Sequence, residues 1–170
     1  MRQTAMRHPD PAPYVTTVVA SMQAEDQPQS LFRAIDAALA QAIGHVLFTI
    51  LVHHPDRREN ERFYTNRPAE YPVGGRKPLA DTAWTRQVIG RGEPYIGRSA
   101  DDIRSVFFDH ALILSLGCES VLNVPLRWRG ETLGTLNLLH RAAYYHEADV
   151  ATARLFAALA LPGVMMLAGK

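Results

Sequence analysis

The stretch ESVLNVPLRWRGETLGTLNLLH, residues 119–140, decides the fold of this chain. Runs of Val, Leu, Thr and Trp flank Arg129 and Gly130 on both sides, and glycine tolerates the positive φ that a tight turn needs. The pattern therefore predicts two antiparallel strands joined at this turn. The first strand carries Asn123 and Pro125, and the second carries Gly134 and Asn137.

A second segment, WTRQVIGRGEPYIG at residues 84–97, indicates a helix, a glycine stop and a short strand, and an acidic loop with Asp101 and Asp102 follows it. The order of these parts resembles the GAF domain family, whose members are small-molecule-sensing modules of signalling proteins. The matching segments run from about Leu31 to about Ala158. The resemblance rests on the number and order of the motifs, so it indicates the architecture better than the chemistry.

The order of helical and strand patterns predicts an α+β domain in which an antiparallel sheet carries helices. The resemblance implies a sheet of five or six strands, with the terminal helices packed on one face and a ligand pocket on the other. It also implies a lid over that pocket from about Asn66 to Leu116. We expect residues 1–27 to form an N-terminal extension and helix, and residues 28–168 to form a single domain.

The spacing of apolar residues, together with the residues that begin and end helices, predicts the remaining elements. We expect helices at residues 14–25, from about 29 to Gly44, 82–89, 109–116 and 147–161, and strands at residues 46–52 and 62–65. Pro162 is expected to kink or end the last helix because it lacks a backbone N–H. The loop from Asn66 to Pro78 is rich in Gly and Pro, and we expect it to be more mobile than the hairpin.

Composition limits the class of protein. The formal net charge of +1 steers the chain toward neither nucleic acid nor an anionic membrane. A single cysteine, Cys118, excludes an intrachain disulfide and suits a reducing compartment. The N-terminus is interrupted by prolines where a signal peptide needs an apolar run, and the apolar stretch 155–169 is shorter than the ~20 residues that span a bilayer. We therefore expect a cytoplasmic protein without membrane contact.

Aromatic, amide and hydroxyl side chains are the usual components of a small-molecule site. The candidate ligand-binding residues are Trp84, Tyr95, Phe107, Phe108, His110, Ser120, Asn123 and Asn137. For Trp84, Phe107 and Phe108, core or lid packing is the favoured explanation over direct ligand contact. Each asparagine lies in an apolar strand, where its amide needs a partner, and that partner can be backbone. Because the two asparagines occupy facing strands, we expect Trp84, Tyr95, Ser120, Asn123 and Asn137 to converge on one face of the sheet.

The segment Gly74-Gly75-Arg76-Lys77 is a possible anion contact. Glycine backbone beside two cations can hold a carboxylate or phosphate through N–H groups and charge. The spacing differs from that of a P-loop, and a solvated turn is the favoured explanation of the segment.

Neither a metal centre nor a catalytic residue is predicted. His53 and His54 are adjacent, so in a strand they point to opposite faces and cannot converge on one ion. No Ser-His-Asp pattern, carboxylate dyad or nucleotide fingerprint is present. One branch of the resembled family reduces free methionine sulfoxide with several cysteines, whereas this chain has only Cys118. The cyclic-nucleotide branch has a lysine after its asparagine, whereas Leu138 follows Asn137 here.

The resulting hypothesis is a stand-alone domain that binds a small intracellular molecule and reports its presence without catalysis. The alternatives are a small enzyme that uses the same pocket, and a dimerisation module with a vestigial pocket. The final helix is apolar on more than one side, so we expect a homodimer through the terminal helices, unless these helices cover each other within one chain. The sequence identifies neither the ligand nor a cofactor.

Overall fold

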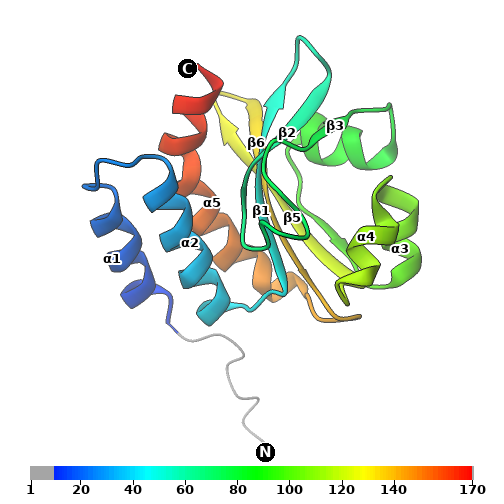
Figure 1. Ribbon diagram of the computed structural model, residues 1–170, viewed down its shortest axis with the longest axis horizontal. Coiled ribbons are helices and arrows are strands. Elements are labelled where there is room, and N and C mark those ends of the chain that lie inside the picture. Colours follow the sequence, from blue (N-terminus) through cyan, green and yellow to red (C-terminus); the bar gives the residue numbers. More distant parts are fainter. Residues whose placement is uncertain (1–9, 170) are drawn as a thin grey trace, which may run out of the picture.

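The hairpin predicted from residues 119–140 lies within a six-stranded antiparallel sheet (Figure 1). The computed structural model describes residues 10–169, so residues 1–9 of the expected N-terminal extension lie outside the described residues. The strand order is β3-β2-β1-β6-β5-β4. The strands are β1 (Leu47–His54), β2 (Glu59–Thr65), β3 (Arg76–Pro78), β4 (Tyr95–Gly97), β5 (Ser120–Trp128) and β6 (Glu131–His140). The expected α+β architecture, with a sheet of five or six strands, is therefore confirmed, and the sheet has six.

Backbone geometry explains two positions of the hairpin. Arg129 and Gly130 have φ values of 51° and 82°, as the two central residues of a type I′ turn require. Gly134 lies in β6 where the backbone of β1 approaches it most closely. A Cβ atom at this position would overlap the carbonyl oxygen of Leu51. The glycine thus permits the pairing of β1 with β6 that joins the hairpin to the rest of the sheet.

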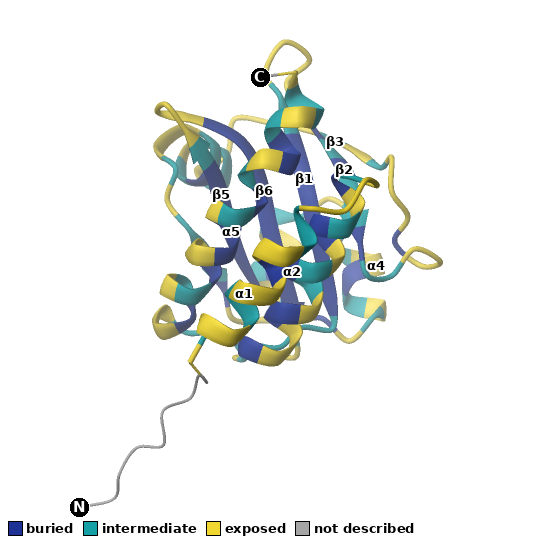
Figure 2. Ribbon diagram, turned by 90° about the vertical axis from the view of Figure 1, so that its left-hand side faces the viewer, coloured by how far each residue is buried: buried dark blue, intermediate teal, exposed yellow. Residues whose placement is uncertain are grey.

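Three helices cover one face of the sheet, namely α1 (Ala12–Ser21), α2 (Gln29–Ala42) and α5 (Glu147–Ala168) (Figures 1 and 2). Phe32 of α2 and Phe156 of α5 are fully buried against Leu122 and Leu138 of the sheet. Val18 of α1 is also fully buried. The terminal helices are therefore held to the sheet by a continuous apolar core.

The expectation that Pro162 ends the final helix is wrong, because α5 continues to Ala168. The proline leaves the carbonyl of Ala158 without its helical donor. Ala158 is exposed, so water can hydrate that carbonyl. The next turn packs Gly163 and Val164 into the core, and this burial offsets the lost hydrogen bond.

Among residues 10–169, α5 is the one helix long and apolar enough to cross a membrane. Its buried side, which includes Ala153, Phe156 and Val164, packs into the core of this domain. A core helix passes the same test of length and composition, so the absence of membrane contact stays a prediction.

Among residues 10–169, β3 and β4 form the two edges of the sheet, and the opposite face carries three short helical segments. These are the π-helix η1 (Thr85–Arg91), α3 (Ala100–Val106) and α4 (His110–Ser115). The expected acidic loop at Asp101 and Asp102 is instead the first turn of α3. Ser99 and Asp102 cap this helix reciprocally, each side chain accepting from the other residue's backbone N–H. A smaller apolar cluster that includes Ile103, Ile113 and Val121 supports these segments.

Candidate ligand pocket

A row of polar residues crosses the sheet on the face opposite the helices. Thr49 of β1 pairs with Asn137 of β6, Asn137 pairs with Asn123 of β5, and Asn123 pairs with Tyr95 of β4. Directly opposed residues share a face of a sheet, so all four side chains lie on this side. The neighbouring positions Leu122 and Leu138 point into the core beneath the helices.

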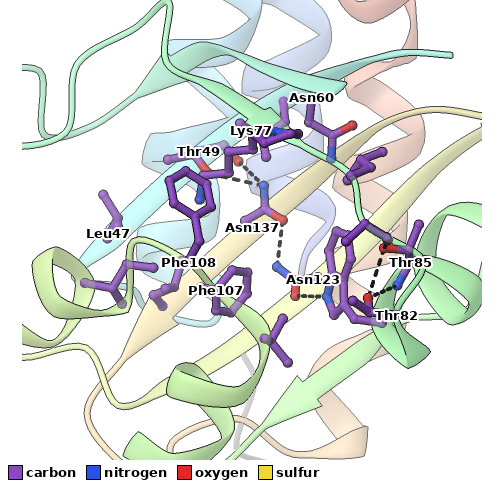
Figure 3. A pocket seen from close by; sticks show the side chains of 18 of the residues that line it. Leu47, Thr49, Asn60, Lys77, Thr82, Thr85, Phe107, Phe108, Asn123 and Asn137 are labelled. Atoms are coloured by element: carbon purple, nitrogen blue, oxygen red, sulfur yellow. Dashed lines mark hydrogen bonds between the residues drawn. The ribbon is translucent and has the colours of Figure 1, made fainter. Parts of the chain in front are cut away.

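A chain of hydrogen bonds joins the polar side chains of this floor (Figure 3). The indole Nε1 of Trp84 donates to Asn123 Oδ1 at 2.9 Å, and Asn123 Nδ2 donates to Asn137 Oδ1 at 2.7 Å. Asn137 Nδ2 in turn contacts Oγ1 of Thr49 and of Thr135, at 3.2 and 3.1 Å. Each amide oxygen has a second lone pair, so the floor can accept a hydrogen bond from a ligand.

A cavity of about 170 Å³ lies above this floor. Trp84 and Phe107 form an aromatic wall, with their rings in an edge-to-face arrangement and centroids 6.3 Å apart. Phe108, which is 67% exposed, lines the cavity and marks where it opens to solvent. The remaining apolar lining includes Leu47 and Leu139. The cavity thus combines an apolar wall with a few fixed polar groups, which is the usual composition of a small-molecule site.

Charged and aromatic side chains meet beside the cavity. The ammonium of Lys77 lies 3.0 Å from Asp109 Oδ2 and donates to the hydroxyl of Tyr71 at 2.6 Å. Tyr71 donates its hydroxyl proton to Asp109. The guanidinium of Arg62 lies 3.4 Å from the centre of the Tyr71 ring and 3.9 Å from Asp109 Oδ2. These contacts tie the segment before β3 to the start of α4, so that both cover the cavity.

Burial and charge set the protonation of this cluster. Burial lowers the pKa of Lys77, although the Asp109 charge opposes the shift. Burial alone would raise the pKa of Asp109, but the Lys77 charge and the hydrogen bonds to this carboxylate outweigh it and lower the pKa. Burial and the Asp109 charge raise the pKa of Tyr71 far above its usual value. At neutral pH the carboxylate is therefore ionised and the phenol is neutral.

The structure brings most of the expected site residues to this cavity. Trp84, Phe107, Phe108, Asn123, Asn137 and Lys77 all line it. Tyr95 lies on the same face of the sheet but packs into the smaller apolar cluster. His110, the first residue of α4, is not among the lining residues.

Ser120 and Arg76 are placed differently from the expectation, for the same physical reason. Side chains alternate along a strand, and Ser120 is three positions from Asn123, so it lies on the other face. Its hydroxyl donates to the carbonyl of Arg141 at 2.7 Å. Arg76 is adjacent to Lys77 in β3 and pairs with Glu59 and with Glu61, the latter at 3.2 Å, away from the cavity.

Sequence reasoning missed several contributors to the site, among them Thr49, Asn60, Tyr71 and Asp109. Thr49 interrupts an otherwise apolar strand, and that polar position is the signal that identifies it. The Tyr71 and Asp109 contact joins residues 38 positions apart, so no local pattern reveals it.

The described histidines and Cys118 do not line the cavity, although His53 contacts Asn60, which does. His53 contacts Asn60 and His54 contacts Glu61, each at 3.0 Å, on opposite faces of β1. Within residues 10–169, no group of three His, Cys, Asp or Glu side chains is placed to hold a metal ion. Cys118 is fully buried and is not among the residues that line the cavity. Burial raises the pKa of its thiol to about 11.

Comparison with protein families matches residues 25–161 to the family described as GAF domain. No curated protein gave a significant match to the chain.

Solved structures of such domains are similar to this fold. The GAF domain of a two-component sensor histidine kinase from Bacillus halodurans superposes with a TM-score of 0.67 at 14% identity, covering 85% of this chain and 99% of that one. The phycoerythrobilin-bound GAF domain of a cyanobacterial phytochrome gives 0.66 at 12% identity, covering 94% and 97%. A free methionine-R-sulfoxide reductase from Neisseria meningitidis, in complex with its substrate, gives 0.64 at 19% identity, covering 91% and 89%.

Proposed function

This chain belongs to the GAF domain family, and we propose that it is a sensory domain whose cavity binds a small molecule without catalysing a reaction on it. GAF domains are ligand-binding sensory domains of signalling proteins. We place the ligand site of this chain between the sheet and the segment from Asn66 to Leu116.

One observation carries the proposal, namely the hydrogen-bonded row of Trp84, Asn123 and Asn137 at the base of an otherwise apolar cavity. Burying two amides in a sheet costs stability unless they are paired, and a pair of leucines would fill the same positions without that cost. The amides supply what a plain core lacks, which is a fixed set of hydrogen-bonding groups facing an open space. This arrangement favours a binding role over a vestigial pocket.

The cavity also suggests the size of the ligand. A volume of about 170 Å³ lies below the roughly 300–1,000 Å³ of sites for drug-sized molecules. The site therefore suits a molecule of one ring or a single amino acid.

The alternative is an enzyme like the reductase from Neisseria meningitidis, which this chain resembles in fold. Thiol chemistry of that type returns the oxidised sulfur to a thiol through a disulfide, which needs a second cysteine. Cys118 is the only cysteine of the chain, is fully buried, and has a thiol that stays protonated at neutral pH. These features favour binding without catalysis.

We also propose a cytoplasmic homodimer held by the terminal helices. Val19 of α1 and Leu155 and Met166 of α5 are 47%, 39% and 62% exposed, which leaves apolar surface on the outer sides of both helices. A symmetric contact between two copies would cover it. The near-neutral charge and the single reduced cysteine support a cytoplasmic location.

A thermal-shift screen with a library of small polar and aromatic molecules tests the binding function. Ala80 lines the cavity and is exposed, so Ala80→Trp should obstruct the cavity without disturbing the core. We expect some compounds to raise the melting temperature of the wild type and to lose this effect in the variant. Compounds that stabilise both proteins equally, or none that stabilise either, would contradict the proposal.

A further inference from the structure

We propose that the ligand of this cavity is a small organic monoanion whose carboxylate pairs with Lys77 while its apolar body lies against Trp84 and Phe107. The inference rests on the proposed binding function and adds the chemical class of the ligand.

The cluster of Arg62, Lys77 and Asp109 beside the cavity has a surplus of positive charge. Arg62 and Lys77 each carry a positive charge, whereas Asp109 is the one carboxylate in the described part of the chain that lies within ion-pairing distance of either. Their side chains are 6%, 15% and 15% exposed, so water screens this charge poorly. The two cations are paired with one carboxylate, so the cluster has one surplus positive charge. A buried charge without a partner is unfavourable. One bound monoanion would balance it.

The Lys77 ammonium also has hydrogen-bonding capacity left for a ligand. Lys77 has three N–H donors, and the acceptors that it contacts among residues 10–169 are the Asp109 carboxylate and the Tyr71 hydroxyl. One donor is left for a ligand. The ammonium lies 5.4 Å from the centre of the Phe107 ring, which is itself a wall of the cavity, so this donor is within reach of a bound molecule.

Arg62 and Arg76 are less suited to make this contact. The Arg62 guanidinium is stacked on Tyr71, donates to the carbonyl of Pro72 at 2.6 Å, and is not among the residues that line the cavity. Arg76 pairs with Glu59 and Glu61 on the outer side of β3. Lys77 is therefore the cation that a ligand can touch, and Figure 3 shows it beside the same space as Asn137 and Phe108.

The shape of the cavity completes the inference. Trp84 and Phe107 offer flat apolar surface on one side, and the cationic group lies beside Phe107. A molecule with one charged end and one ring or short chain fits both features. The single surplus charge favours a monoanion over the dianion of a phosphate ester.

Matched acid and amide probes test the charge requirement. Trp84 lies at the cavity and Trp128 is distant in β5 and 47% exposed, so Trp128→Phe leaves the fluorescence of Trp84 as the signal. In this background the probes are phenylacetate against phenylacetamide and butyrate against butyramide. We expect at least one acid to bind about tenfold or more tightly than its amide, in line with the strength of charge-assisted hydrogen bonds.

Three variants test whether Lys77 is the residue that pairs with the carboxylate of the probe. Lys77→Met should abolish the preference for the acid, and Lys77→Arg should retain it because the charge is kept. Arg76→Met, a matched change on the outer side of β3, should leave it intact. Circular dichroism melting of each variant controls for loss of the fold.

The outcomes separate the two proposals. Equal binding of acid and amide that Lys77→Met leaves unchanged would overturn the anion inference while the binding function stands. The anion inference would likewise be overturned, and the binding function would stand, if the thermal-shift screen yields ligands whose effect is lost in Ala80→Trp and none of them is an anion. If phenyl phosphate binds more tightly than phenylacetate in a Lys77-dependent way, the assignment to a monoanion is wrong. If no probe binds and the screen is also empty, both proposals fall.

Discussion

The side-chain amide of Asn123 donates a hydrogen bond of 2.7 Å to the amide oxygen of Asn137, its direct cross-strand partner in the hairpin. The two residues are 1% and 4% exposed, so the contact is made almost without water. Trp84 and Thr49 extend it at the two ends. The floor of the cavity is therefore a fixed polar network in an apolar sheet, and its members should be sensitive to substitution.

Asn137→Ala should destabilise the domain. The change removes the acceptor of Asn123 Nδ2 and the donor to Thr49 and Thr135, and each buried polar group left unpaired costs about 1–3 kcal/mol. Urea denaturation measures the loss of unfolding free energy. Ser120→Ala removes a buried hydroxyl from the other face of the sheet and should leave the binding of any cavity ligand unchanged. An Asn137→Ala protein as stable as the wild type would contradict the network.

Gly134→Ala should be severely destabilising, because its Cβ would overlap the backbone oxygen of Leu51 and neither strand can shift without losing pairing. Overpacking of this kind costs about 1–3 kcal/mol or more. Gly90→Ala is the matched control, because the nearest atom to its added Cβ lies 3.9 Å away. Comparable melting temperatures for the two variants would show that β1 and β6 do not approach as described.

Cys118 should resist alkylation in the folded protein. Its thiol is fully buried, and burial raises its pKa to about 11, so the reactive thiolate is scarce at pH 8. Mass spectrometry after treatment with iodoacetamide should show modification only when urea unfolds the chain. Rapid alkylation under native conditions would reopen the enzyme alternative.

Stability should fall as the pH is lowered below about 6.5. Burial lowers the pKa of His53 from 6.5, despite the opposing effect of its hydrogen bond to Asn60 Oδ1, and burial likewise lowers the pKa of His140. Between the lowered pKa and 6.5 the unfolded chain binds protons that the folded chain does not, so acid favours unfolding in this window and has no such effect above it. His53→Gln should reduce the loss between pH 7.5 and 5.5 in urea titrations. An unchanged pH dependence in this variant would rule out the assignment to His53.

Sedimentation equilibrium at micromolar concentration tests the proposed homodimer. Leu155→Asp places a charge on the outer side of α5 and should yield monomer. Leu112→Asp changes a leucine of equal exposure, 39%, on α4 and should leave the dimer intact. A monomeric wild type, or dissociation by both variants, would contradict an interface at the terminal helices.

The sequence predicts the elements that local patterns encode. The hairpin follows from its Arg129–Gly130 turn, and the shared face of Asn123 and Asn137 follows from their facing strands. Side chains alternate between the two faces of a strand, which separates Ser120 from Asn123 and Arg76 from Lys77. Predicting these faces requires the strand bounds, and composition does not give them. The contact of Tyr71 with Asp109 depends on the packing of the segment before β3 against the start of α4, which only the folded chain brings about. Pro162 fails as a stop because tertiary burial of Val164 outweighs a local preference.

Nuclear magnetic resonance mapping determines whether small molecules bind in the cavity beside Trp84, Asn123 and Asn137. The ¹⁵N-labelled protein is titrated with a fragment library, and the side-chain N–H signals of Trp84, Asn123 and Asn137 are followed together with those of Trp128 as an internal control. The account predicts that binding fragments shift the signals of the three cavity residues, leave Trp128 unchanged, and lose their effect in Ala80→Trp. Fragments that bind only elsewhere, or that shift the three signals equally in the obstructed variant, would contradict a ligand site in this cavity.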